Sequence, residues 1–147
     1  MGRSTKEVQE NLISNMESWR KIENASIAST GRVIEKTENP IVRLVMEIIQ
    51  RDSQMHYRVQ ELIADSLQKT VSLTPEELGD VWGLIEDHIK IEERVLKLAE
   101  ESLEASKDSK GMVIQSYLLE YLLEDEKKHN LMLERLSGIR KGMYPYA

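Results

Sequence analysis

Residues 118–132, LLEYLLEDEKKHNLM, have the apolar periodicity of an amphipathic helix. Leu118, Leu122 and Met132 fall on one face at helical spacing, and Asp125 and His129 occupy the same stripe. An ionisable group is costly to bury unless it is paired or coordinates a metal. This stretch therefore predicts a helix that carries polar chemistry on its core face.

Three further segments have the same helical period, and two of them begin with good caps. Asn39-Pro40 and Thr74-Pro75 each place a capping side chain before a proline in the first turn, and the cluster KDSKG at 107–111 makes the third break. The expected elements are helices at about 5–36, 40–69, 75–106 and 111–138, with a non-helical tail at 139–147.

Short connections predict antiparallel neighbours, so we expect an all-α, up-down-up-down four-helix bundle that forms one domain over 1–147. In the tail, Tyr144 and Tyr146 are expected to pack on the bundle or on a partner chain.

The composition excludes several functional classes. A net charge of −6, with basic residues scattered among acids, argues against nucleic-acid binding. The absence of cysteine excludes disulfides and thiolate metal sites. No segment approaches the roughly 18 apolar residues of a membrane span, and the first twenty residues hold no signal-peptide core. We therefore expect a soluble, cytoplasmic protein with no nucleic-acid or membrane partner.

Ionisable residues interrupt the apolar stripe of every expected helix, and the antiparallel connections place them at similar heights. Residues equidistant from a turn lie side by side, which puts the three histidines in one layer and three acids in the next, with Glu23 near that height. The candidate metal ligands from this argument are Glu23, Asp52, His56, His88, Glu92, Asp125 and His129.

Carboxylate and imidazole together suit iron, zinc or manganese, and a divalent metal pair would neutralise the acids. The alternative is a polar or ion-paired core layer. The basic residues near enough in sequence to form such ion pairs are Lys21, Arg58, Lys90 and Arg94.

The segment Glu126-Lys127-Lys128-His129 resembles the Glu-x-x-His motif of ferritin-like di-metal carboxylate bundles. The resemblance is to a small, divergent member of the rubrerythrin kind without a rubredoxin domain. The ligands that it implies are Glu23, His56, Glu92, Glu126 and His129.

Three features depart from this pattern, and one of them is His88, a histidine that the family pattern does not require. Ser53 occupies the place of a glutamate in the second helix, so Asp52 must substitute for it, and the link between the second and third helices is shorter than the crossover of ferritins. Asp125 and Glu126 remain alternatives for one ligand position, because the height argument favours Asp125 and the motif favours Glu126.

The segment His88-Ile89-Lys90-Ile91-Glu92 resembles, more weakly, the His-x-x-x-Glu helix of hemerythrin-like bundles. That family needs more histidines than the three present in this chain.

We expect from these resemblances a metal-binding protein, with a non-haem di-iron centre that reacts with oxygen or peroxide or handles iron. An oxidoreductase activity stays open, and the sequence assigns no catalytic residue. The alternatives are a non-catalytic helical interaction protein with a structural or vestigial metal site, zinc included, and hemerythrin-like oxygen binding. Homo-oligomer formation also stays open.

Overall fold

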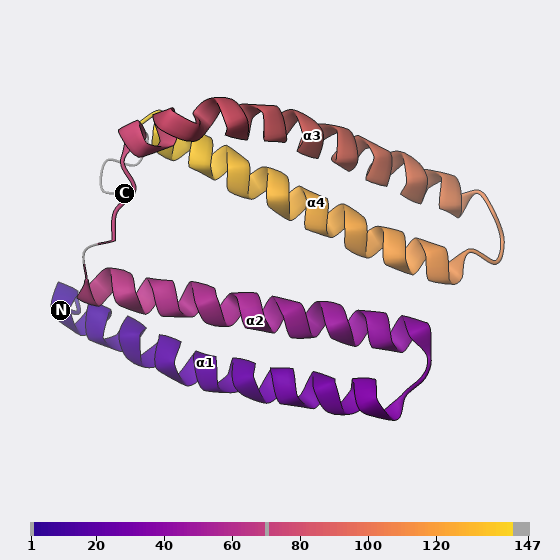
Figure 1. The fold of residues 1–147 in the computed structure, drawn as a ribbon, viewed down its shortest axis with the longest axis horizontal. Helices are drawn as coiled ribbons and strands as arrows, with labels where there is room; N and C mark the ends of the chain where they lie inside the picture. The colour runs from indigo at the N-terminus through magenta and orange to yellow at the C-terminus, as the bar shows by residue number, and fades with distance from the viewer. Residues whose placement is uncertain (1, 70, 143–147) are drawn as a thin grey trace. The chain divides into compact units, whose positions relative to one another are not determined.

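The computed structural model describes residues 2–69 and 71–142, and over these residues the protein is all-α, with four helices and no strand. The prediction of four helices is confirmed. The helices are α1 (Thr5–Lys36), α2 (Pro40–Gln68), α3 (Pro75–Lys107) and α4 (Val113–Arg140) (Figure 1).

Both caps predicted from the sequence are present. Asn39 Oδ1 accepts the backbone N–H groups of Ile41 and Val42 at 3.0 and 3.2 Å. Thr74 and Glu77 form a reciprocal capping box, with each side chain accepting the backbone N–H group of the other residue. These bonds satisfy N–H groups that have no partner within the helix, so they fix where α2 and α3 begin.

The last helix ends later than its predicted boundary. Residues 139 and 140, assigned from the sequence to a tail, are helical, and the chain turns at Gly142, whose φ is +73°. A left-handed residue after the last turn is the usual stop signal of a helix, and glycine adopts it without strain. Gly138, by contrast, lies inside the helix. The predicted packing of Tyr144 and Tyr146 falls outside the described residues.

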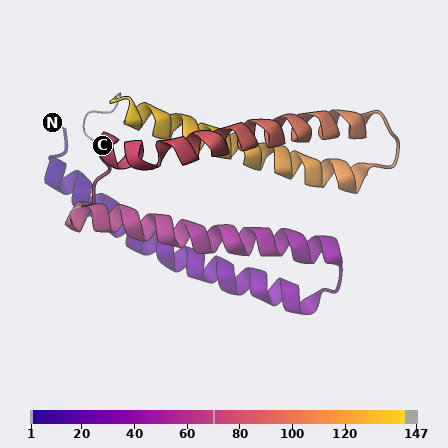
Figure 2. The ribbon, with the colours of Figure 1, turned by 45° about the horizontal axis from the view of Figure 1, so that its top comes forward.

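The chain divides into two compact units, Met1–Ser72 and Leu73–Ala147. The first unit is a hairpin in which α1 and α2 lie side by side (Figures 1 and 2). Ser26 Oγ lies 2.9 Å from Ser53 Oγ, and Gln50 Nε2 donates to the carbonyl of Ile27 at 3.1 Å. These pairs lie at decreasing distance from the connection, as expected when two helices run in opposite directions.

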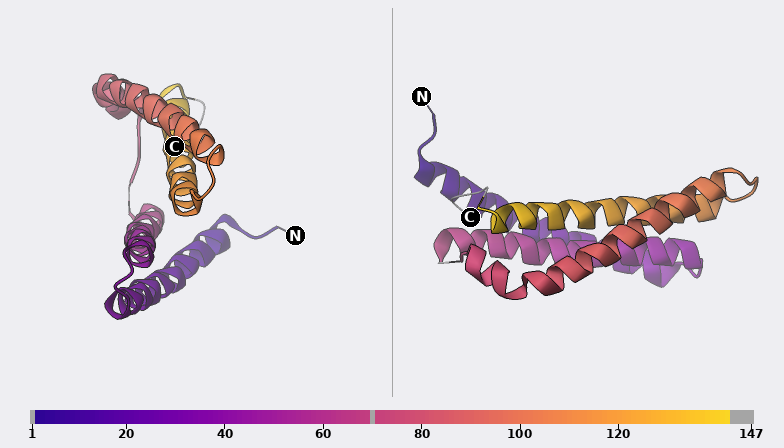
Figure 3. Two further views of the ribbon diagram at one scale, coloured as in Figure 1. Left: turned by 90° about the vertical axis from the view of Figure 1, so that its right-hand side faces the viewer. Right: turned by 90° about the horizontal axis from the view of Figure 1, so that it is seen from above.

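The second unit is the hairpin of α3 and α4, which cross each other along their length (Figure 3). Near the connection, Ser106 Oγ lies 2.8 Å from Ser116 Oγ. At the other end the guanidinium of Arg140 lies 4.9 Å from the ring of the buried Trp82. Leu78 and Leu103 are also buried in this unit.

Both hairpins expose large apolar side chains. In the first, Trp19 and Met55 are 50% and 52% exposed, and in the second Leu84 and Leu98 are 75% and 61% exposed. Two helices alone have only one shared face to bury, so a hairpin leaves much of its apolar surface in contact with water. Over its described residues, none of the four helices has an apolar stretch long enough for a membrane span.

Candidate metal centre

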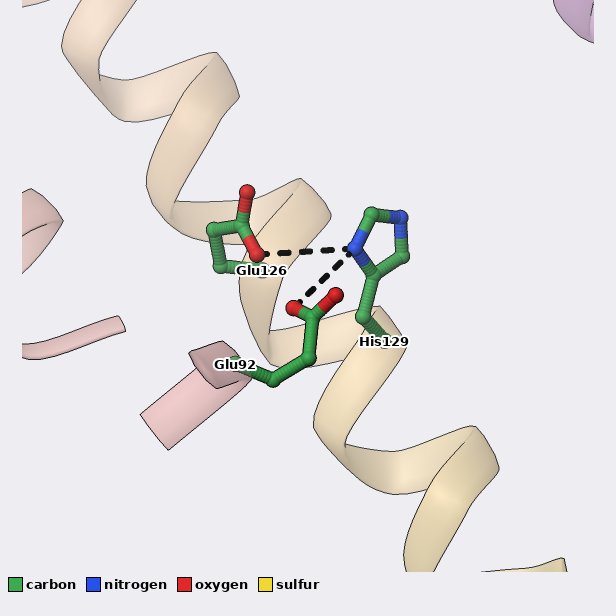
Figure 4. Close-up of side chains that lie close together, drawn as sticks. All are labelled: Glu92, Glu126 and His129. Carbon is green, nitrogen blue, oxygen red and sulfur yellow. Dashed lines mark ion pairs between the residues drawn. The ribbon is translucent and has the colours of Figure 1, made fainter. Parts of the chain in front are cut away.

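Two glutamates and a histidine meet between α3 and α4. Glu92 comes from α3, and Glu126 and His129 lie one turn apart on α4 (Figure 4). His129 Nδ1 is 3.4 Å from Glu92 Oε2 and 3.4 Å from Glu126 Oε2. One potential ligand atom from each residue lies within 4.8 Å of the others. We call these three residues the Glu92 cluster.

The Glu92 cluster is supported by two further residues that the sequence singled out. His88 Nε2 contacts Glu92 Oε1 at 2.9 Å, and Asp125 Oδ2 lies 3.4 Å from His129 Nε2. Asp125 also forms a 2.7 Å ion pair with Lys128. His129 therefore directs one ring nitrogen to the glutamates and the other to Asp125.

Asp125 and Glu126, the two alternatives for one ligand position, have different surroundings in the structure. Glu126 faces Glu92 and belongs to the cluster, whereas Asp125 stands behind the imidazole of His129. An i, i+3 spacing places Glu126 and His129 on one face of α4, because three residues make nearly one helical turn.

The second oxygen of Glu92 lacks a hydrogen-bond donor. Glu92 Oε2 is buried and forms no hydrogen bond within the described part of the chain, although His129 Nδ1 lies 3.4 Å from it. When Glu126 is protonated, it can donate a hydrogen bond to Glu92. That hydrogen bond from Glu126 lowers the pKa of Glu92, and His88 and His129 lower it further, although burial opposes them.

Glu126 shows the opposite shift. Hydrogen bonding to the Glu92 carboxylate raises the pKa of Glu126, and burial and the negative charge of Glu92 act in the same direction, while His129 partly opposes them. Ionisation of both carboxyl groups at once is therefore unfavourable, and a bound cation would relieve this repulsion.

Access to the Glu92 cluster is open. A surface hollow of about 300 Å³ lies beside it and is lined by His88, Glu92, His129, Met132 and Leu133. The side chains of Glu92 and Glu126 are 12% and 15% exposed, while that of His129 is 38% exposed. A small ion or molecule can thus reach the cluster without unfolding the hairpin.

A second polar group lies between α1 and α2. Glu23, which is 6% exposed, receives a hydrogen bond from Gln60 Nε2 at 3.2 Å and lies 3.3 Å from His56 Nδ1. Ser53 also hydrogen-bonds to Glu23, and Gln60 and Ser53 are themselves buried. We call Glu23, Ser53, His56 and Gln60 the Glu23 cluster.

Neutral donors hold Glu23 as an anion. Burial by itself raises the pKa of Glu23, but the hydrogen bonds from Ser53 and Gln60 and the approach of His56 together lower it below its ordinary value. The negative charge of Glu23 is therefore stabilised by hydrogen-bond donors within its own hairpin.

The structure separates the predicted ligands into these two groups. Glu23 and His56 lie together, as their predicted heights require. Asp52, expected to replace the missing glutamate, is half-buried, and no hydrogen bond or ion pair joins it to Glu23 or His56 in the described chain. Ser53, one residue further on, faces Glu23 instead.

Gln60 was missed by the sequence reasoning. Its position one turn after His56 in the same stripe was the available signal, because residues four apart share a helix face. Gln60 is 3% exposed, and its Oε1 has no hydrogen-bond donor among the described residues.

The alternative prediction was that basic residues form ion pairs with the candidate ligands, and the described part of the structure contains only a few ion pairs of this kind. Lys90 pairs with Asp87 at 3.9 Å on the surface, and no ion pair joins Lys21, Arg58 or Arg94 to a candidate ligand over residues 2–69 and 71–142. Lys128 pairs with Asp125, whereas within the described residues the ion-pair contacts of Glu92 and Glu126 are to histidine rings.

No protein-family model matches the chain, and comparison with curated proteins and with solved structures gives no match either. The resemblance to ferritin-like bundles therefore rests on the motif residues and on the helical architecture.

Proposed function

We propose that this protein binds a divalent transition metal, with iron as the first candidate, through Glu92, Glu126 and His129. One observation carries the proposal: two largely buried carboxylates and an imidazole nitrogen converge within 4.8 Å, and one of the carboxylate oxygens is buried without a donor. Over the described residues, no lysine or arginine pairs with either glutamate, so a cation bound between the two carboxylates would offset their mutual repulsion.

The donor set favours iron, zinc or manganese over calcium or magnesium, because it includes imidazole. His129 would offer Nδ1 to the metal, and Asp125 Oδ2 lies 3.4 Å from Nε2 on the other side of the ring. A carboxylate behind a metal-binding histidine fixes the orientation of its ring. Iron at this position supplies redox chemistry with oxygen or peroxide, in agreement with the ferritin-like resemblance.

The same proposal includes closure of the two hairpins into one four-helix bundle. Each hairpin has an apolar face that needs covering, and the polar clusters of both lie in the middle of their helices. The ferritin-like resemblance is what implies this closure, because a di-iron pair takes its donors from all four helices.

A structural zinc site is the second candidate. It is favoured by Ser53, which stands where the resemblance implies a glutamate, so that the α1–α2 hairpin offers fewer carboxylates than a di-iron centre normally uses.

Elemental analysis of tag-free protein tests the proposal. After loading with Fe(II) without oxygen, or with Zn(II), and removal of excess metal, we expect at least one equivalent per chain. Glu92→Gln and His129→Ala should lose it. Glu124→Gln, an exposed change on the same helix, should retain it.

A metal content far below one equivalent per chain after both Fe(II) and Zn(II) loading would contradict the proposal. Exposure of the Fe(II) protein to air separates the two candidates. An oxo-bridged absorption band supports redox iron, and tight zinc binding without any iron oxidation supports the structural site.

A further inference from the structure

A methionine side chain lies beside the Glu92 cluster. Met132 follows His129 by three residues on α4, so the two side chains share one face of the helix. Met132 lines the hollow of about 300 Å³ together with His88, Glu92, His129 and Leu133, and it is 64% exposed. A small molecule in the hollow therefore meets the Met132 side chain and two of the proposed metal ligands together.

The thioether of Met132 is the most readily oxidised group in this wall. The other lining residues contribute two imidazoles, a carboxylate and an aliphatic chain, and the protein has no cysteine. Methionine takes up one oxygen atom to form a sulfoxide, which turns a flexible apolar side chain into a polar one. Met132 is therefore the residue of the hollow best suited to accept oxygen from a peroxide.

From this arrangement we infer that Met132 is a modification site, at which the metal centre directs the oxidation of its own chain by hydrogen peroxide. The inference rests on the proposed metal-binding function. In the step, the sulfur attacks one peroxide oxygen, the O–O bond breaks and an S–O bond forms. The other oxygen leaves as water after it takes the proton of the first. Sulfur is oxidised by two electrons and peroxide is reduced by two, so the step needs no other reactant.

A metal ion accelerates this step in two ways. A cation held by Glu92, Glu126 and His129 would stabilise the negative charge that develops on the departing oxygen. It would also raise the concentration of peroxide beside Met132, because the hollow and the Glu92 cluster adjoin each other. Free peroxide lacks both advantages, so the oxidation of Met132 should depend on metal.

Oxidation changes the chemistry of the hollow. The sulfoxide oxygen accepts hydrogen bonds, and the imidazoles of His88 and His129 line the same hollow as possible donors. Sulfoxide reductases return methionine sulfoxide to the thioether, so the change is reversible. Met132 would thus record the exposure of the metal centre to peroxide.

Met112 provides a comparison within the same hairpin. It is 40% exposed and caps the start of α4, about 30 Å along the helix from Met132 at 1.5 Å per residue. The hollow that it lines contains none of the candidate metal ligands. Each methionine is compared with itself in the presence and absence of metal, so the difference in exposure does not affect the result.

The experiment uses tag-free protein loaded with Fe(II) without oxygen, freed of excess metal and analysed for iron. A small excess of hydrogen peroxide is added, and sulfoxide is measured at each methionine by peptide mass spectrometry. Compared with chelator-treated protein, we expect sulfoxide at Met132 to form about 10-fold faster or more, because the metal holds the oxidant close. Met112 should react at the same rate in both samples.

Two variants test whether bound iron is responsible. Glu92→Gln with the same iron added should oxidise Met132 no faster than the metal-free protein does. Glu124→Gln, an exposed change on the same helix as Met132, should keep the full acceleration. An acceleration that persists in Glu92→Gln would mean that iron outside the site drives the reaction, and the inference would be wrong.

The remaining outcomes separate this inference from the proposed function. If iron binds and Met132 is oxidised no faster than in chelator, the inference is wrong and the metal site stands. Oxidation that falls on His88 or His129 in place of Met132 also overturns it. If no iron binds, the inference fails, whereas the proposed function fails only if zinc does not bind either.

Discussion

Replacing Glu126 by glutamine separates the role of its charge from the role of its shape. Potential ligand atoms of Glu92 and Glu126 lie within 4.8 Å, and their side chains are only 12% and 15% exposed. Two unit charges at that distance, with an effective dielectric constant of about 20, repel each other by about 3 kcal/mol. His129 offsets part of this repulsion. We therefore expect Glu126→Gln to stabilise the metal-free protein by about 1–2 kcal/mol at neutral pH.

The pH dependence of this gain follows from the direction of the pKa shifts. A raised pKa for Glu126 means that its protonated form stabilises the fold below the ordinary pKa of 4.5, and this contribution disappears as the pH rises through the folded-state value. The advantage of the variant should thus be absent below pH 4.5 and grow above it. Glu92 has a lowered pKa, so its contribution is present above pH 4.5 and is lost on acidification below it.

Metal should reverse the order of stability. At a free zinc concentration 100-fold above Kd, binding stabilises the unaltered protein by about 2.7 kcal/mol. The variant, which has lost one anionic ligand, gains less. We expect Glu126→Gln to melt higher than the unaltered protein in chelator and lower in zinc.

Thermal melts followed by circular dichroism provide the assay, because a change of 1 kcal/mol moves the Tm of a chain this size by about 2–4 °C. Glu124→Gln is the matched control: the carboxylate lies on the same helix, is 72% exposed, and should change stability by less than about 0.5 kcal/mol. A Glu126→Gln protein that is less stable in chelator, or that keeps the full gain from zinc, would refute the argument.

Three other predictions concern Ser53, Trp82 and the arrangement of the hairpins. Ser53→Glu should destabilise metal-free protein, since it buries a second carboxylate beside Glu23, and melts with and without Fe(II) should show recovery by metal; a metal-independent loss contradicts this. Arg140→Ala should cost about 1 kcal/mol and shift the fluorescence of Trp82 to longer wavelength in a Trp19→Phe background, because it removes the cation over a buried ring; an unchanged spectrum contradicts this. If the hairpins close into one bundle, X-ray scattering should give a radius of gyration of about 15 Å, and a clearly larger value would indicate that they stay apart.

The helices were predictable because their signals are local. Caps such as Asn39 and Thr74 act within one turn, and their bonds form as the sequence indicates. The end of α4 was misplaced, because Gly138 and Gly142 are equally plausible stop signals in the sequence. Only the backbone conformation, left-handed at Gly142, distinguishes them.

The candidate site was predictable at the level of helix and height but not at the level of single residues. Asp52 and Ser53 differ by about 100° around the helix, and so do Asp125 and Glu126. Comparing positions along the helix axis cannot show which of two neighbouring residues faces the other helix, because they differ by only about 1.5 Å along that axis. The packing of each hairpin decides it, and turns Ser53 and Glu126 toward the neighbouring helix.

Each polar cluster is complete within a single hairpin, and both lie far from the connection between α2 and α3. Cleavage between Ser72 and Leu73 would therefore separate the chain into two peptides without breaking a contact of either cluster. Such halves form a natural pair for fragment complementation, in which metal-dependent reassociation of two separately labelled pieces reports directly on whether their donors share an ion.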